Sequence, residues 1–222
     1  MQRRTFLTAA LAAPSLAWAA GPSLTVLELF TSQGCSSCPP ADALLGQLAQ
    51  RPDTIAMAWH VDYWNYLGWK DPYADKRWTE RQRDYARHLR GEVYTPAMVV
   101  NGATMLVGSD GYGVTQAMAH AAPLPAPVSL RRTATGLEAA NGSAPAGATA
   151  QLVIYDPENA TAVRAGENAG RQLKEYRIVR EVRDVPVSAG SVSLAAVGPT
   201  QGAALLLRDA AWRLIGAADA KI

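Results

Sequence analysis

The chain has 222 residues, of which 49% are hydrophobic, and carries 21 Lys and Arg against 19 Asp and Glu. Two of the basic residues, Arg3 and Arg4, lie in a leader-like segment, and without them the charges of both signs balance. This lack of a basic surplus excludes nucleic acid and anionic membranes as expected partners, because such binding depends on neutralising many phosphates.

The first twenty residues have the pattern of a signal peptide. Arg3 and Arg4 precede an apolar stretch at 6–16, and residues 17–19 (Ala-Trp-Ala) have the small-x-small form of a cleavage site. We therefore expect an exported protein, periplasmic or secreted, that keeps no membrane anchor after cleavage near residue 20. The arginine pair also resembles the twin-arginine export signal, and an ordinary Sec signal is the alternative.

Residues 21–122 are expected to alternate between strands and helices. Apolar runs predict strands, and apolar residues at helical spacing predict helices with one buried face. The expected elements are a strand at 24–30, a helix at 41–50, a strand at 54–61, a helix within 72–90, strands at 97–101 and 104–107 joined by Asn101-Gly102, and a helix at 111–122. This β-α-β-α-β-β-α order predicts an α/β thioredoxin-like domain, with two parallel strands followed by a hairpin.

The second part of the chain is predicted to be a small all-β, sandwich-like domain at 128–222. Three prolines within 123–127 predict a linker, because proline blocks the continuation of a helix. Short β-like runs with turn signals such as Asp156-Pro157 between them follow. The expected strands lie near 128–132, 136–140, 150–155, 174–182, 192–196, 203–208 and 213–217.

Cys35 and Cys38 are the only cysteines, and they directly follow the first predicted strand. Two thiols at this spacing suit disulfide exchange, in which Cys35 attacks and Cys38 resolves the mixed disulfide. The expected partners are protein or small-molecule thiols and disulfides, and this chemistry needs no cofactor. The prolines at 39 and 40 leave two choices: an irregular first helical turn, or a helix that starts nearer Cys38 with both prolines in its first positions.

Three other uses of the cysteine pair stay open at the level of sequence. A permanent structural disulfide is one, although a loop this short constrains the unfolded chain little. A metal-handling protein, for example for copper, would use Cys35, Cys38 and His60. A binding module would keep an inert disulfide and recognise its partner through another surface. We assign no metal site.

Four further residues are candidates for the site. Thr95-Pro96 precedes the predicted hairpin, where thioredoxin-like proteins place a cis-proline beside the cysteines, and would shape the substrate groove. Glu28, an acid in an apolar strand, is a candidate for proton transfer because burial would raise its pKa. His60, with Asp62 nearby, is a second candidate for proton transfer.

The chain resembles a bacterial exported family catalogued as domain of unknown function 1223. The stretches that carry the resemblance are 27–42, 60–64, 68–72, 94–96 and 166–171. The resemblance implies a thioredoxin-like fold but no established substrate. Together with the site residues it leads us to expect an exported thiol–disulfide oxidoreductase.

Overall fold

The computed structural model describes residues 24–141, 144–187 and 190–221, so the predicted leader at 1–20 lies outside the described residues. In the first part of the chain the elements follow in the expected order. They are β1 (Thr25–Thr31), α1 (Pro39–Leu48), β2 (Thr54–His60), a 3-10 turn η1 (Asn65–Leu67), α2 (Lys76–Leu89), β3 (Ala97–Val100), β4 (Thr104–Val107) and α3 (Gly111–Ala119).

The second part contains strands close to the predicted positions. They are β5 (Ser129–Thr133), β6 (Gly136–Ala140), β7 (Thr149–Ala162), β8 (Gln172–Val185), β9 (Ser191–Ala195), β10 (Gly202–Arg208) and β11 (Leu214–Ala220). The turn predicted at Asp156-Pro157 is wrong, because both residues lie inside the long strand β7. Proline is tolerated there because β10 pairs with β7 only as far as Tyr155, so that edge of β7 has no neighbouring strand at Pro157.

The predicted fold class is wrong. Among the described residues, eight strands from both parts of the chain form one mixed sheet in the order β11-β10-β7-β8-β2-β1-β3-β4. The two parts join where β8 runs parallel to β2, with Ala58 opposite Ile178. The chain is therefore not a thioredoxin-like domain followed by a separate β-sandwich. A smaller sheet holds the remaining described strands, in the order β5-β6-β9.

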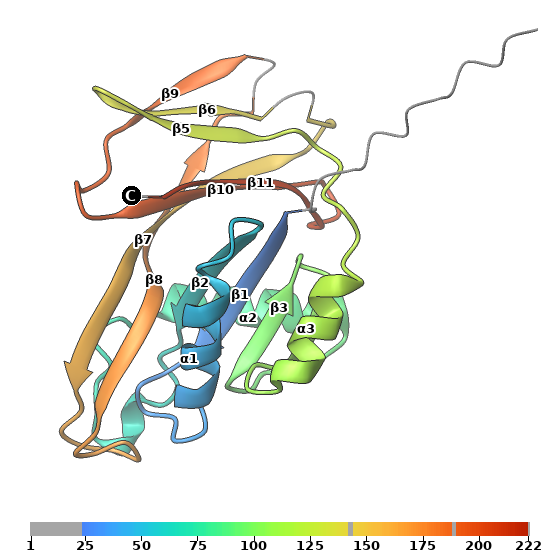
Figure 1. Cartoon of the computed structure of the whole chain (residues 1–222). Coiled ribbons are helices and arrows are strands. Elements are labelled where there is room, and N and C mark those ends of the chain that lie inside the picture. The colour runs from blue at the N-terminus through green and yellow to red at the C-terminus, as the bar shows by residue number, and fades with distance from the viewer. Residues whose placement is uncertain (1–23, 142–143, 188–189, 222) are drawn as a thin grey trace, which may run out of the picture.

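Helices cover both faces of the sheet around β1, while the small sheet covers its other end (Figure 1). The side chains of β1 alternate between these faces, as successive residues of a strand must. Leu27 and Leu29 pack with Leu45 of α1, whereas Phe30 packs with α2 and with residues of β7, β8 and β10. The core on the α2 side is thus shared by both parts of the chain.

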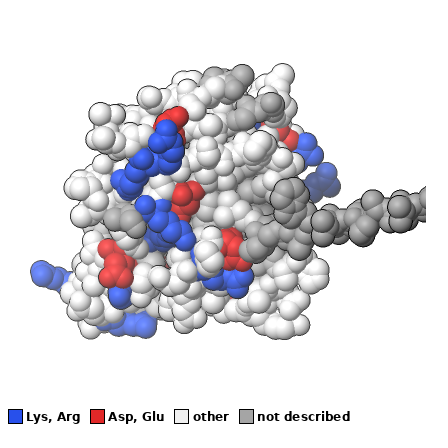
Figure 2. Space-filling view, turned by 45° about the horizontal axis from the view of Figure 1, so that its top comes forward, with Lys and Arg blue, Asp and Glu red and all other residues white. Residues whose placement is uncertain are grey.

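The surface carries charges of both signs in small groups. Figure 2 shows Lys and Arg beside Asp and Glu, with broad uncharged areas between the groups on this face. Within the described part of the chain, no helix has the length and apolar character to cross a membrane.

Glu28 links the two parts of the chain through a buried ion cluster. Its carboxylate accepts from Arg81 Nε on α2 at 2.7 Å and from Arg208 Nη2 on β10 at 3.0 Å, and Tyr85 Oη also donates to it. Burial would raise the pKa of Glu28, but the attraction of Arg81 and Arg208 prevails and holds this pKa below its ordinary value. Glu28 is therefore an ionised structural anchor.

We predict that Glu28→Ala lowers the free energy of unfolding by about 3–5 kcal/mol at neutral pH, because it leaves two buried guanidinium groups without their carboxylate. The pKa of Glu28 is lower in the folded state than its ordinary value of 4.5. The ionised carboxylate therefore stabilises the fold fully above pH 4.5, and this stabilisation is lost as the pH falls below that value. Urea unfolding measures both effects. The control Glu80→Ala breaks an exposed pair with Lys76, and an equally small loss in both variants would contradict the prediction.

Candidate active site

The candidate site is built around a disulfide between Cys35 and Cys38, at the junction of β1 and α1. Both cysteines are fully buried, whereas Ser36 and Ser37 between them are exposed. Helix α1 begins only at Pro39, with Cys38 as its N-cap residue. The predicted start near Cys38, with both prolines in the first helical positions, is thus confirmed. Because proline has no N–H group, neither of these positions can donate to a thiolate.

Thr95 and Pro96 lie beside the cysteine loop, and the peptide bond between them is cis. Strand β3 pairs with β1 so that Ala97 is opposite Phe30, which brings Pro96 to the end of β1 where the loop starts. Trp64 connects the two segments, because its Nε1 donates to Thr95 Oγ1 at 2.7 Å. A Cβ at Gly34 would lie 2.9 Å from Trp64 Cβ, so only glycine fits before Cys35.

The loop between β7 and β8, residues 163–171, covers the disulfide. Asn168 is fully buried, and its Nδ2 donates to the backbone oxygens of Gln33 and Cys35, both at 2.9 Å. Arg171 fixes this side chain by donating to Asn168 Oδ1 at 2.8 Å, and Glu167 accepts from the backbone N–H of Ser36 at 2.9 Å. No motif or spacing in the sequence points to these residues. The only signal for them was the family resemblance at 166–171.

Glu167 influences the surroundings of Cys35. Its carboxylate occupies the Ser36 N–H, a group that could otherwise stabilise an anion on the adjacent Cys35. It also places a negative charge beside the cysteine loop. Both effects disfavour a thiolate at Cys35 and so favour the disulfide form.

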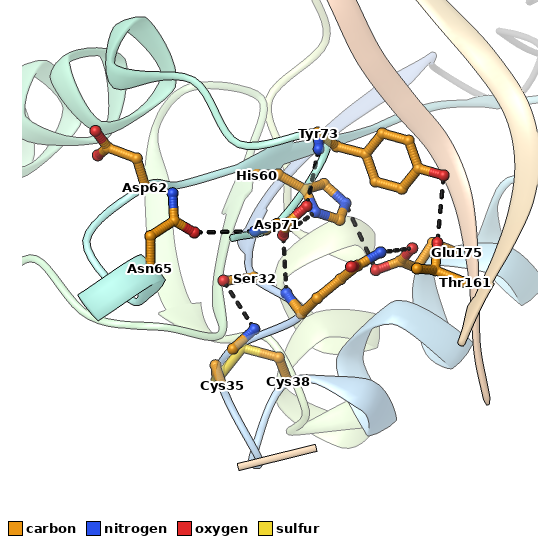
Figure 3. A network of polar contacts seen from close by, with 12 residues as sticks. Ser32, Cys35, Cys38, His60, Asp62, Asn65, Asp71, Tyr73, Thr161 and Glu175 are labelled. Atoms are coloured by element: carbon orange, nitrogen blue, oxygen red, sulfur yellow. Dashed lines mark hydrogen bonds and ion pairs between the residues drawn. A yellow bond between two sulfur atoms is a disulfide. The ribbon is translucent and has the colours of Figure 1, made fainter. Parts of the chain in front are cut away.

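His60 belongs to a buried polar network behind the cysteine loop (Figure 3). Its Nδ1 lies 2.8 Å from Asp71 Oδ2, which also accepts from the backbone N–H of Gln33 at 2.9 Å. The side chain of Gln33 donates to Glu175 Oε2 on β8 at 2.7 Å, and His60 Nε2 lies 4.0 Å from Glu175 Oε1. The carboxylate partner of His60 is thus Asp71, while Asp62, its neighbour in sequence, accepts from Thr79.

The network holds His60 in its charged form. Burial alone would lower the pKa of this imidazole, but the neighbouring Asp71 carboxylate raises it to about 9. Burial tends to raise the pKa of Asp71, and the charge of His60 keeps it below its ordinary value. The pKa of Glu175 is raised, mainly because the group is buried. A cation with this pKa is a fixed charge at neutral pH rather than a proton carrier.

The geometry gives no support to the predicted proton-transfer role of Glu28. Its side chain points to the α2 face of β1, toward Arg81, whereas Leu27 and Leu29 on the other face contact α1, the helix that follows the disulfide. The alternation of a strand explains the difference, since residues one apart point to opposite sides.

The chain matches the family model described as "Protein of unknown function (DUF1223)" over residues 26–206. It belongs to this family. A crystal structure of a protein from Agrobacterium tumefaciens is similar, with 30% identity and a TM-score of 0.74 over 91% of this chain and 96% of that one. HBP35 of Porphyromonas gingivalis aligns over 90% of this chain and 76% of its own, with 14% identity and a TM-score of 0.60, and shows the fold alone. No curated protein matches.

The arrangement of the cysteines and His60 does not favour a metal-handling role. Both sulfurs are engaged in the disulfide, and His60 is bonded to Asp71. Within the described ranges, no three His, Cys, Asp or Glu side chains are grouped so that they could hold a metal ion.

We predict that His60 makes stability depend on pH. Because its pKa is raised from 6.5 to about 9, its stabilisation is complete below pH 6.5 and is lost as the pH rises through about 9. The loss amounts to about 3 kcal/mol. Urea unfolding from pH 7 to pH 10 should show this decline in the wild type and in the exposed control His88→Gln. The same decline in His60→Gln would refute the assignment.

We also predict that the 163–171 loop limits access to the disulfide. Asn168→Ala removes the two hydrogen bonds that join the loop to Gln33 and Cys35, each contributing about 1 kcal/mol, so the loop should open more often and dithiothreitol should reduce the disulfide about 10- to 30-fold faster. Asn159→Ala, an exposed position on β7, is the matched control. Equal reduction rates for wild type and Asn168→Ala would show that the loop does not govern access.

Proposed function

We propose that the chain is an exported thiol–disulfide oxidoreductase whose redox group is the Cys35–Cys38 pair. The observation that carries the proposal is the disulfide itself, closed at the end of β1 and flanked by the cis Thr95–Pro96 bond. A disulfide across a two-residue gap adds little to stability, because it constrains the unfolded chain little. Its placement beside a built network of buried polar groups favours chemistry over a purely structural role.

In the proposed reaction the reduced protein transfers two electrons to a substrate disulfide. The Cys35 thiolate attacks one substrate sulfur, forming a mixed disulfide and releasing the other substrate sulfur as a thiolate. Cys38 then attacks Cys35 Sγ, which restores the Cys35–Cys38 disulfide and releases the second substrate thiolate. A dithiol donor returns the protein to its reduced form.

The reducing direction follows from the surroundings of Cys35. The prolines at 39 and 40 and the carboxylate of Glu167 withhold stabilisation from a thiolate, and against them stands the neutral hydroxyl of Ser37, whose Oγ lies 3.3 Å from Cys35 Sγ. We take the disulfide to be the favoured state. A pair whose disulfide is favoured gives up electrons readily, the reverse of strong oxidants, in which the reduced form is stabilised. Substrate would approach from the side of the exposed Ser36 and Ser37, with Thr95 and Pro96 lining the groove.

We also propose that the protein acts outside the cytoplasm. The signal-like pattern of residues 1–20 supports export, which delivers the pair to a compartment where disulfides form and persist. N-terminal sequencing of protein recovered from the periplasm tests this, and an intact leader or purely cytoplasmic recovery would count against it.

We predict that the protein equilibrated with glutathione or dithiothreitol buffers titrates as one two-electron couple at or below about −230 mV. The reduced wild type should reduce a protein disulfide such as that of insulin. Cys35→Ser should abolish this activity, and Cys38→Ser should stop at a mixed disulfide that mass spectrometry detects. Wild-type activity in Cys35→Ser, or a disulfide that no reductant reaches in the folded protein, would instead indicate a binding module with an inert disulfide.

A further inference from the structure

Asp42 is a buried acid one helical turn after Cys38. It lies in the first turn of α1 with 4% of its surface exposed, and its N–H donates to Cys38 O at 3.2 Å. Side chains four residues apart on a helix lie on the same face, with their Cβ atoms about 5–6 Å apart. The side chains of Asp42 and Cys38 therefore extend from the same buried face of the helix.

The carboxyl of Asp42 is incompletely satisfied by the protein. Its Oδ1 is buried and has no hydrogen-bond partner. Among the described residues six other buried side-chain atoms share this condition, and three of them, Thr31 Oγ1, His60 Nε2 and Glu175 Oε1, belong to residues that act on the pKa of Asp42. A buried polar atom without a partner costs free energy, so such atoms are rare unless they serve a purpose. Against the effect of burial, the Thr31 hydroxyl group lowers the pKa of Asp42, while Asp42 Oδ1 stays available to accept a hydrogen bond, or a proton, from a neighbouring group.

The charges around Asp42 come from three other parts of the chain. His60 on β2 attracts a negative charge at Asp42, while Glu175 on β8 and Asp71 in the loop after β2 repel it. Burial is the largest influence and, with these charges, raises the pKa of Asp42 to about 7. Glu28, in contrast, is held ionised by two arginines on the other face of β1.

We propose that Asp42 accepts the proton of the Cys38 thiol in the resolving step of disulfide exchange. This inference rests on the proposed function and adds a proton acceptor to it. As the S–H bond of Cys38 breaks, its proton passes to Asp42, and the sulfur electron pair forms the bond to Cys35 Sγ. The Cys35–substrate bond breaks at the same time, and the substrate sulfur leaves as a thiolate. When a dithiol donor later reduces the pair, Asp42 returns the proton to Cys38.

The mixture of charges around Asp42 suits this role. The fixed positive charge of His60 keeps the ionised carboxylate accessible near neutral pH, while burial and Glu175 keep the protonated form accessible as well. A group poised near the working pH is the best general base or acid. An arginine in the place of His60 would hold the carboxylate ionised, as Arg81 and Arg208 do with Glu28.

The test uses reduced protein mixed rapidly with a chromogenic aromatic disulfide, so that the release of each thiolate is observed. The wild type should release two equivalents: the first when Cys35 attacks and the second when Cys38 resolves. Cys38→Ser should release only one. Asp42→Asn should release the first at the wild-type rate and the second about 100-fold more slowly at pH 7, the lower end of what a general base contributes.

The pH profile separates proton transfer from a structural defect. As the pH rises from 7 to 9, hydroxide takes over the removal of the Cys38 proton, so the deficit of Asp42→Asn relative to the wild type should shrink. Asp42→Ala should behave in the same way, and the exposed variant Glu80→Gln should match the wild type at every pH. Thermal unfolding of each variant verifies that it is folded.

The outcomes distinguish the two proposals. If Cys35→Ser still releases thiolate, or the wild type releases none, the proposed function fails. If the cysteine variants behave as expected but Asp42→Asn resolves at the wild-type rate with the wild-type pH profile, only the role of Asp42 is overturned. The same holds if both Asp42 variants are slow at pH 7 and equally slow at pH 9.

Discussion

The parallel pairing of β8 with β2 is the contact on which the rest of the site depends. It places Glu175 within reach of His60, and it carries the 163–171 loop onto the cysteine pair. It also brings Tyr176 against Gly46 of α1, where a Cβ would lie 2.4 Å from the ring. The second part of the chain thus forms one side of the site. A fragment ending before β7 would leave the disulfide uncovered.

Local pattern in the sequence was sufficient for much of the fold and for the centre of the site. Apolar runs and helical spacing gave the elements from β1 to α3 in order, and Asn101 and Gly102 both adopt the positive φ of the predicted turn. The disulfide is one of the states expected of two cysteines at this spacing, and the cis bond before Pro96 was expected from the place that thioredoxin-like proteins give to such a proline. The strand positions in the second part were also close, since turn residues separate them.

Long-range pairing was beyond the reach of such patterns. The alternation of apolar residues in a strand such as β8 shows which of its faces is buried, but not which strand it pairs with. The pairing with β2 joins segments more than a hundred residues apart in the sequence and is decided by shape and burial. The error in fold class and the oversight of Asn168, Glu167 and Glu175 have this one cause. The face of Glu28 could be inferred only once Leu27 and Leu29 were known to contact α1.

The two buried acids near β1 show how the partner decides what a carboxyl group can do. Glu28 is bonded to guanidinium groups that keep their charge at every relevant pH, and it serves as a permanent link between α2 and β10. Asp42 has one positive neighbour, His60, and two acidic ones, Glu175 and Asp71, that oppose its ionisation. The first arrangement fixes a charge, whereas the second leaves it adjustable.

The 163–171 loop over the disulfide also has a consequence for folding during synthesis. Asn168 lies 133 positions after Cys35, so the cysteines are synthesised well before the residue that closes over them. Until β7 and β8 have formed, oxidants and other thiols meet the pair directly. The redox state in which the site is sealed is therefore decided by the compartment where the second part of the chain folds.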